Sequence, residues 1–128
     1  MSAIKSKGTK PELILAKALW ERGHRYRKNN PKVFGKPDFT FKKYKIAIFV
    51  DGEFFHGHNW SERKEKLISN REYWIPKIEK NIARDKAVNQ HLIASGWQVI
   101  RFWSKFINAH LDLCISIIER EIENAEVK

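Results

Sequence analysis

The apolar residues near the start of the chain recur at helical spacing. Thr9-Lys10-Pro11-Glu12 has the form of a capping box, which marks the start of a helix, and Gly23 is a typical stop. Between them four apolar residues are spaced for one face of a helix: Leu13, Ala16, Leu19 and Trp20. We therefore predict a first helix over about residues 10–22.

The next apolar runs have the length and spacing of β-strands. A short extended piece around residues 25–27 is followed by a loop rich in Pro, Gly and Asn over residues 29–37. Two strand-like runs then flank the turn at residues 42–45, the first over residues 38–41 and the second over residues 45–50. This pattern predicts a hairpin whose open ends lie side by side.

The second half of the chain is mainly helical in its pattern. Residues 52–69 are polar and lack a clean period, so we expect a functional loop with one helical turn. A helical pattern fills residues 70–95, where Pro76 should break or kink the helix near its start. Residues 97–103 predict a strand, and residues 108–124 predict an amphipathic helix. The order of elements predicts an α/β fold with a small mixed central sheet flanked by helices.

Size and charge limit what can surround this sheet. At 128 residues with 42% hydrophobic content, residues 1–128 fit a single domain with one core. No apolar run approaches the length of a bilayer span, so we expect no membrane association. Residues 1–45 hold 13 of the 25 Lys and Arg residues but only 3 of the 15 Asp and Glu residues. This uneven charge favours a polyanionic partner, with double-stranded DNA as the leading candidate.

Acidic and imidazole side chains surround the second strand of the predicted hairpin. Asp38 opens the first strand, and Asp51, Glu53, His56 and His58 follow the second. Because the open ends of a hairpin meet, these groups should share one place. Carboxylate and carbonyl oxygens suit a hard divalent cation, and a neutral imidazole beside them can carry a proton near neutral pH. The sequence therefore predicts a hydrolytic metal site.

Motifs along nearly the whole chain resemble one nuclease family. They are, in order, Glu12, Pro37-Asp38, Phe49-Val50-Asp51-Gly52, Phe54-Phe55-His56-Gly57-His58, Tyr73-Trp74-Ile75-Pro76-Lys77-Ile78 and Asn81-Ile82-Ala83-Arg84-Asp85. In this order the chain resembles the very short patch repair (Vsr) endonucleases, which have the PD-(D/E)XK restriction-endonuclease-like fold. The resemblance implies that fold and a DNA endonuclease activity that leaves a 5′-phosphate.

The resemblance also implies a role for individual residues. Asp38 would ligate Mg²⁺ together with the backbone carbonyl of Val50, and His56 would be the acid/base group. Glu12 and Asp85 would assist. From the residues alone, Glu12 could equally serve only to cap its helix, and Asp85 could form an ordinary surface ion pair.

Asp51 occupies a position at which this chain departs from many repair-type relatives. The candidate catalytic set of Glu12, Asp38, Asp51, His56 and Asp85 resembles the EDxHD pattern of homing nucleases, in which Asp51 stands at the variable position. Many repair-type members have His there. Asp51 can bind the cation or orient water, but it cannot replace a His as a positively charged acid.

Aromatic and basic residues are the candidate DNA contacts. The resemblance implies that Phe54, Phe55 and Trp74 wedge between base pairs, and we expect at least one of the three to be exposed. Basic residues of the N-terminal third would contact backbone phosphates: Lys5, Lys7, Lys10, Arg25, Arg27 and Lys36.

The loop after the second strand departs from the family in another way. Vsr repair enzymes share a structural Zn²⁺ site built from Cys and His, and the corresponding positions here are Glu53, His58, Trp60 and Lys105. One possible ligand does not make a tetrahedral site. We therefore expect no structural zinc and a loop that is held by packing, to which Trp60 contributes.

These features leave three functions open. The first is a Mg²⁺-dependent DNA endonuclease that nicks at a T:G mismatch, as in very short patch repair. The second is a restriction, homing or mobile-element nuclease on the same scaffold without mismatch specificity, and the third is a non-catalytic DNA-binding module. We favour the first, in a monomer that acts in the cytoplasm at the nucleoid, with mismatch-repair or mobile-element proteins as candidate partners.

Overall fold

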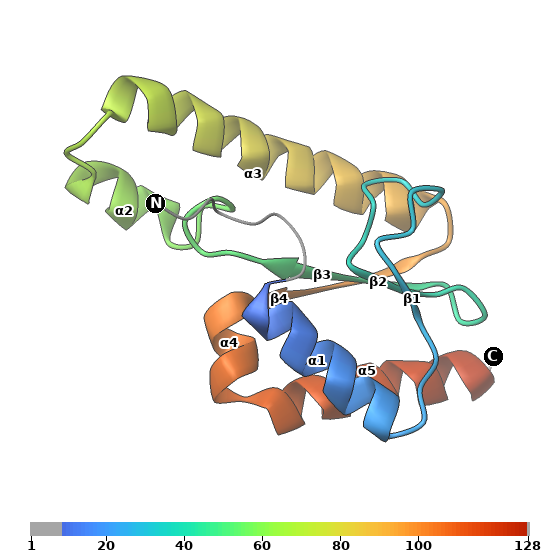
Figure 1. Cartoon of the computed structure of the whole chain (residues 1–128). Helices are drawn as coiled ribbons and strands as arrows, with labels where there is room; N and C mark the ends of the chain where they lie inside the picture. Colours follow the sequence, from blue (N-terminus) through green and yellow to red (C-terminus); the bar gives the residue numbers. More distant parts are fainter. Residues whose placement is uncertain (1–8, 128) are drawn as a thin grey trace.

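The computed structural model describes residues 9–127, so Lys5 and Lys7 lie outside the described residues. Figure 1 shows its helices and strands, coloured along the chain. In order they are α1 (Lys10–Glu21), β1 (Arg27–Lys28), β2 (Phe39–Phe41), β3 (Ile46–Asp51), α2 (Trp60–Lys66), α3 (Arg71–Ala94), β4 (Gln98–Trp103), α4 (Ser104–Ala109) and α5 (Leu111–Val127).

The four strands form one mixed sheet in the order β1-β2-β3-β4. The hairpin of β2 and β3 is antiparallel, as predicted, and β1 pairs antiparallel with β2. β4 lies parallel to β3, with a register that runs from Ile46 opposite Gln98 to Asp51 opposite Trp103. Helix α3 covers one face of the sheet, and α1, α4 and α5 cover the other (Figure 1). The predicted α/β architecture, a small mixed sheet flanked by helices, is confirmed.

The alternation of β3 supplies both apolar layers. Ile46 and Ile48 are buried in the larger core with residues of α1, α4 and α5, whereas Phe49 packs with Val88 and Leu92 of α3. A strand that is covered on both faces needs a continuous apolar run, which explains why its sequence does not alternate with polar residues. The same alternation turns the last residue of β3 towards the α3 side.

The starts of two helices differ from their predictions. Thr9 is the N-cap of α1, but its side chain makes no capping hydrogen bond within the described residues, and Glu12 is buried instead of reaching back. The predicted capping box is therefore wrong. Pro76 does not break α3, which runs on from Arg71 to Ala94. Pro76 is exposed, so the carbonyl that loses its helical partner can bond to water instead.

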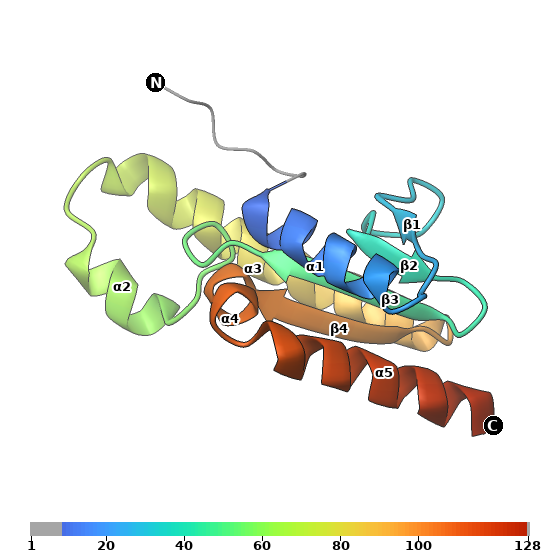
Figure 2. The same cartoon turned by 60° about the horizontal axis from the view of Figure 1, so that its bottom comes forward.

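Two other segments are more helical than predicted. The polar loop contains a helix of 7 residues, α2, instead of one turn. Figure 2 shows α2 and the start of α3 projecting beyond the end of the sheet. The final helical region begins earlier than residue 108, because α4 follows β4 directly and His110, with a φ of −137°, separates it from α5.

The loop before β2 packs tightly against α3 through Gly35. A Cβ at this position would lie 2.5 Å from Cγ1 of Val88, and Gly35 has a φ of +80°. Gly23 has a similar φ of +87°, but a Cβ there would meet no atom within 4 Å. The two glycines therefore differ in the space around them and not in backbone conformation.

We predict that Gly35→Ala lowers the free energy of unfolding by about 2–4 kcal/mol, because a strained backbone and a steric clash add up. Gly23→Ala, the matched control, should lose only about 1 kcal/mol from its positive φ. Urea denaturation of both variants at one pH measures the difference. Equal decreases in the free energy of unfolding of the two variants would show that the loop can move away from Val88 without a loss of stability.

Candidate active site

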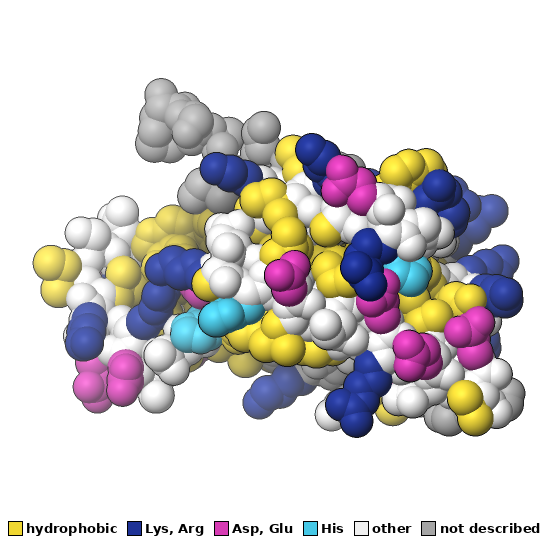
Figure 3. Space-filling model, turned by 90° about the horizontal axis from the view of Figure 1, so that it is seen from below, with side chains coloured by type: hydrophobic (Ala, Val, Ile, Leu, Met, Phe, Trp, Pro, Cys, Tyr) yellow, Lys and Arg dark blue, Asp and Glu magenta, His cyan; other side chains and the backbone are white. Residues whose placement is uncertain are grey.

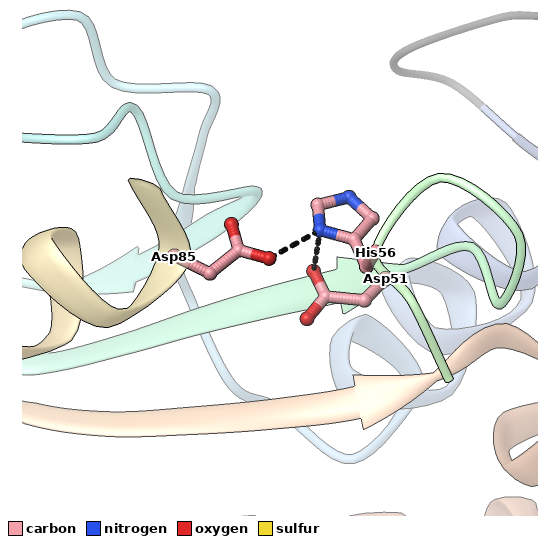
Figure 4. A group of neighbouring side chains, drawn as sticks. All are labelled: Asp51, His56 and Asp85. Carbon is pink, nitrogen blue, oxygen red and sulfur yellow. Dashed lines mark hydrogen bonds and ion pairs between the residues drawn. The ribbon is translucent and has the colours of Figure 1, made fainter. Parts of the chain in front are cut away.

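Three side chains meet where β3 ends (Figure 4). The ring nitrogen Nδ1 of His56, in the loop after β3, lies 2.6 Å from Oδ2 of Asp85 on α3. It lies 3.8 Å from Oδ1 of Asp51, the last residue of β3. The other ring nitrogen, Nε2, points away from both carboxylates (Figure 4). One ring edge is thus held by protein and the other is free to face a substrate.

The loop that carries His56 is fixed against α3. The side chain of Asn81 donates a hydrogen bond of 3.0 Å to the carbonyl of Phe55. Gly57, with a φ of +71°, approaches so closely that a Cβ there would lie 2.3 Å from Cδ1 of Ile82. These contacts flank His56 on both sides and set where its ring emerges. A pocket of about 210 Å³ opens beside it, lined by Asp51, His56, Ile82, Asp85, Lys86, Asn89, Arg101, Phe102 and Trp103.

Arg101 of β4 joins this cluster, although the sequence pattern did not single it out. Its Nη1 lies 3.2 Å and 3.0 Å from the two carboxylate oxygens of Asp51 and 3.7 Å from Oδ1 of Asp85. Its Nε donates to Oδ1 of Asn89 at 2.7 Å, and its guanidinium lies 4.0 Å from the centre of the Phe49 ring. Arg101 therefore offsets the charge of two carboxylates from a fixed position.

A second acidic group lies between the start of α1 and the head of β2. Oδ2 of Asp38 accepts a hydrogen bond of 2.7 Å from the backbone N–H of Val50. Glu12 is only 1% exposed, and its Oε2 has no hydrogen-bond partner among the described residues. Among the described residues the nearest cation to Oε2 of Glu12 is Nζ of Lys28, at 3.7 Å, a residue that the sequence pattern also did not single out. A buried carboxylate oxygen without a donor is costly and suits a bound cation.

Burial raises the pKa of an acidic side chain both in the Glu12–Asp38 pair and in the cluster around His56, but the neighbouring charges differ. Burial raises the pKa of Asp38 to about 7; the Val50 N–H opposes the rise and the neighbouring charges of Glu12 and Asp51 add to it. Burial also raises the pKa of Asp51, against the charges of His56 and Arg101. Burial lowers the pKa of His56, but the hydrogen bond to Asp85 and the charge of Asp51 outweigh it, so the pKa is raised overall.

The predicted aromatic contacts form a cluster of their own. Phe54 lies 5.5 Å from Phe55 and 5.0 Å from Trp74 between ring centres, and Tyr73 lies 4.9 Å from Trp74. We call Phe54, Phe55, Tyr73 and Trp74 the aromatic cluster. Phe54, Phe55 and Trp74 are each half-buried, so the expectation that at least one of them is exposed is wrong. The rings shield one another, and the exposed member is Tyr73, at 59%.

The predicted basic contacts that fall within the described residues lie on different segments. Lys10, Arg27 and Lys36 are exposed, on α1, β1 and the loop before β2. The guanidinium of Arg25 stacks 3.6 Å from the centre of the Trp20 ring, near the end of α1 that is opposite to Glu12. On the face formed by α1, α4 and α5, acidic and basic side chains are interspersed (Figure 3). That face therefore carries no continuous basic surface.

Comparisons with known proteins find relatives of similar sequence. A family model described as DNA mismatch endonuclease Vsr matches residues 1–62. The type II nicking enzyme V.NmeDIP of Neisseria meningitidis serogroup C is 52% identical over 126 residues, covering 98% of this chain and 85% of the relative. V.HpaIIP of Haemophilus parainfluenzae is 60% identical over 104 residues, covering 81% and 74%. DNA mismatch endonuclease Vsr of Escherichia coli is 34% identical over 103 residues, covering 80% and 65%.

The chain belongs to the Vsr family of DNA endonucleases. The resemblance inferred from the motifs is confirmed, and so is the class of enzyme. No helix within residues 9–127 is long and apolar enough to cross a membrane.

The four positions at which Vsr repair enzymes hold zinc are linked here by other contacts. Oε2 of Glu53 accepts a hydrogen bond of 2.9 Å from the backbone N–H of Lys105. The His58 ring packs edge-on against Trp103, with ring centres 4.7 Å apart. Trp60 donates a hydrogen bond of 3.0 Å to Glu79 of α3. The loop is tied to α4 and α3 by hydrogen bonds and to β4 by packing, and the contribution of Trp60 is a hydrogen bond.

A sequence signal for Arg101 does exist. Arg101 stands in strict alternation with Val99 and Trp103, so it is a charged residue on a strand face that should be buried. Asp85, which the family resemblance selected, similarly stands on the face of α3 that carries Ile78 and Ile82. A charge within an apolar period is a useful indication of a buried ion pair. Lys28, in a two-residue strand, has no such signal.

The raised pKa of Asp38 predicts a loss of stability with rising pH. In the unfolded chain this carboxyl releases its proton near its ordinary pKa of 3.8, whereas the folded protein keeps it up to about pH 7. The folded state binds more protons between these values, so the free energy of unfolding should fall across that range. Urea denaturation at several pH values without divalent cations measures this decline, and Asp38→Asn should flatten it.

The flattening should be partial, because Asp51 and His56 also have raised pKa values and add a decline of the same sign. Glu119→Gln is the control. The pKa of Glu119 is lowered from 4.5 to about 2, so its contribution to the free energy of unfolding is lost only as the pH falls below 4.5. Glu119→Gln should therefore leave the decline towards pH 7 unchanged. An undiminished decline in Asp38→Asn would contradict the assignment of Asp38 as the proton-holding group.

Proposed function

We propose that this protein is a Mg²⁺-dependent endonuclease that nicks one strand of double-stranded DNA at a T:G mismatch. The observation that carries the proposal is the pair of buried Glu12 and half-buried Asp38, together with the His56–Asp85 hydrogen bond at the end of β3. The relatives are named as nicking enzymes, and the E. coli relative as a mismatch endonuclease. These names support nicking and mismatch recognition for this chain.

The cation would be held by the carboxylates of Asp38 and Glu12 and by the backbone carbonyl of Val50. The residues fit such an ion, because Glu12 has a buried oxygen without a hydrogen-bond donor and Asp38 is destabilised as an anion by burial and by Glu12. The chemistry that Mg²⁺ supplies when bound is neutralisation of charge on the scissile phosphate and activation of water. Lys28 would help to balance the carboxylates when the cation is absent.

A second set of ligand atoms is less suited to hold the cation. Asp51, His56 and Asp85 offer one atom each within 4.8 Å of one another. However, Arg101 already contacts both oxygens of Asp51, and His56 already bonds to Asp85. A divalent ion there would face the charge of Arg101 and would have to displace these bonds. We therefore assign the cation to the Glu12–Asp38 pair.

His56 is the proposed proton carrier. Its Nδ1 is held by Asp85, which fixes the ring and leaves Nε2 to exchange a proton with the attacking water or the leaving oxygen. Asp85 thus orients the imidazole and stabilises its charged form. Asp51, on the other side of the same nitrogen, completes the proposed catalytic set.

DNA would be held by the aromatic cluster and by basic residues around the site. Phe54, Phe55 and Trp74 lie in or beside the loop that carries His56, so a side chain inserted between base pairs there would place the backbone near the catalytic groups. The basic residues proposed to contact phosphates are Lys5, Lys7, Lys10, Arg25, Arg27 and Lys36. We propose a single-domain monomer, and a duplex DNA substrate places its action in the cytoplasm at the nucleoid. Mismatch-repair or mobile-element proteins are the candidate partners.

The test of this function is a nicking assay on matched oligonucleotide duplexes, one fully paired and one with a T:G mismatch. We expect Mg²⁺-dependent nicking of the mismatched duplex, with a 5′-phosphate at the nick. Asp38→Asn should abolish nicking but keep DNA binding, because the amide cannot anchor the cation yet removes a negative charge near phosphate. Full activity of Asp38→Asn would overturn the metal assignment. Equal nicking of both duplexes would favour a restriction or mobile-element nuclease.

The aromatic cluster should contribute to affinity without contacting phosphates. Phe55→Ala and Trp74→Ala should each weaken DNA binding by roughly 1–3 kcal/mol with little change in the salt dependence, because stacking is lost and charge contacts remain. Phe34→Ala is a matched control, since that ring is 49% exposed and stacks on His91 near the far end of α3. If Phe55→Ala and Trp74→Ala lower the melting temperature but not the affinity per folded molecule, the rings serve only packing.

A further inference from the structure

The side chain of Arg101 in β4 contacts residues of two other elements of the site, β3 and α3. It reaches Asp51 at the end of β3 and both Asp85 and Asn89 on α3. The Phe49 ring supports the guanidinium at 4.0 Å. A planar group with this many fixed partners has little freedom to move, unlike a surface arginine.

The contacts of Arg101 decide which carboxylate His56 can use. Nδ1 of His56 has two acceptors in reach, Oδ2 of Asp85 at 2.6 Å and Oδ1 of Asp51 at 3.8 Å. Arg101 lies 3.2 Å from that same Oδ1 and 3.0 Å from Oδ2 of Asp51, so Asp51 is drawn towards the guanidinium. Its distance of 3.7 Å to Oδ1 of Asp85 leaves the other oxygen of Asp85 free for the imidazole.

We propose that Arg101 is a positioning residue that keeps Asp51 away from His56, so that Nδ1 bonds to Asp85 alone and Nε2 is presented to the substrate. The inference rests on the proposed role of His56 as the proton carrier. It also gives Asp51 a purpose where many Vsr repair enzymes have His. A charged His at that position would face the guanidinium of Arg101, whereas an Asp is complementary to it.

This proposal differs from a purely structural role for Arg101. Any buried ion pair destabilises the fold when one partner is removed, because the other charge is left unpaired. A positioning role predicts in addition that the hydrogen bonding of the His56 ring changes in the folded protein. The decisive readouts are therefore the state of the ring and the rate constant of the chemical step, both measured on folded molecules.

The experiment compares Arg101→Met with a matched control, Arg22→Met. Arg22 also donates two hydrogen bonds to one carboxylate, at 2.7 Å and 2.9 Å to Glu119, but it lies on another part of the molecule and has no role in the site. The single-turnover nicking rate at saturating mismatched DNA, the dissociation constant for DNA and the ¹⁵N NMR signals of the His56 ring are measured for each full-length variant.

Arg101→Met should lower the single-turnover rate roughly 10- to 100-fold, because a small misplacement of a catalytic group has effects of that size. The dissociation constant for DNA should change by less than about threefold, since only the chemical step is affected. The Nδ1 signal of the His56 ring should shift, because Asp51 becomes a second acceptor for the proton on Nδ1. Arg22→Met should leave all three measurements unchanged.

The double variant Asp51→Asn/Arg101→Met tests the mechanism and also covers failure to fold. Without the unpaired carboxylate it should fold even if Arg101→Met does not. It should return the Nδ1 signal of His56 towards that of the unaltered protein, because the competing carboxylate has become a neutral amide. An unchanged Nδ1 signal and rate in Arg101→Met, or a signal that stays shifted in the double variant, would overturn the proposal.

Two further outcomes are distinguishable. A loss confined to DNA affinity would make Arg101 a DNA contact and would overturn the positioning role. Absence of nicking by the unaltered protein would refute the proposed function. The NMR comparison of Arg101→Met with the unaltered protein would still decide whether Arg101 sets the state of the His56 ring.

Discussion

The parallel pairing of β3 with β4 is the constraint on which the site depends. It is the longest pairing in the sheet, from Ile46 opposite Gln98 to Asp51 opposite Trp103. Because side chains alternate along both strands, this register sets Arg101 beside Phe49 and within reach of Asp51. A shift of one residue would turn these side chains to the opposite face and dissolve the cluster.

The two charged groups at the end of the sheet have different physical characters. The Glu12–Asp38 pair is rich in negative charge, and among the described residues the ammonium of Lys28 lies 3.7 Å from Glu12. In the other group, Arg101 and a hydrogen-bonded imidazole offset the carboxylates. Two carboxylates with excess negative charge attract a cation. Carboxylates that are neutralised by Arg101 and the imidazole instead hold these side chains in fixed positions. This difference supports a division of the site into a metal-binding part and a proton-carrying part.

The loop after β3 is held to the rest of the molecule at several points. Glu53 bonds to the backbone of Lys105, and Trp60 bonds to Glu79. The approach of Gly57 to α3 adds a steric constraint on the same loop. Hydrogen bonds and close packing of this kind fix the place where the ring of His56 emerges.

Local patterns in the sequence determined most of the elements and indicated Asp38 and His56 as site candidates, whereas Glu12 and Asp85 came from the family resemblance. The hairpin could be predicted because its strands are adjacent in sequence, and the ends of adjacent strands meet by geometry alone. The motif order added the family, which the comparisons confirm.

Only the tertiary structure decided how these residues interact. Arg101 and Asp51 are 50 positions apart and meet through the parallel register of β3 and β4, which no local pattern specifies. The burial of Glu12 likewise overrode its capping role, because α1 packs with that residue turned towards Asp38. The periodicity of the sequence determines which face of a helix or strand a residue occupies. The pairing of elements that are distant in sequence determines which other residues pack against that face.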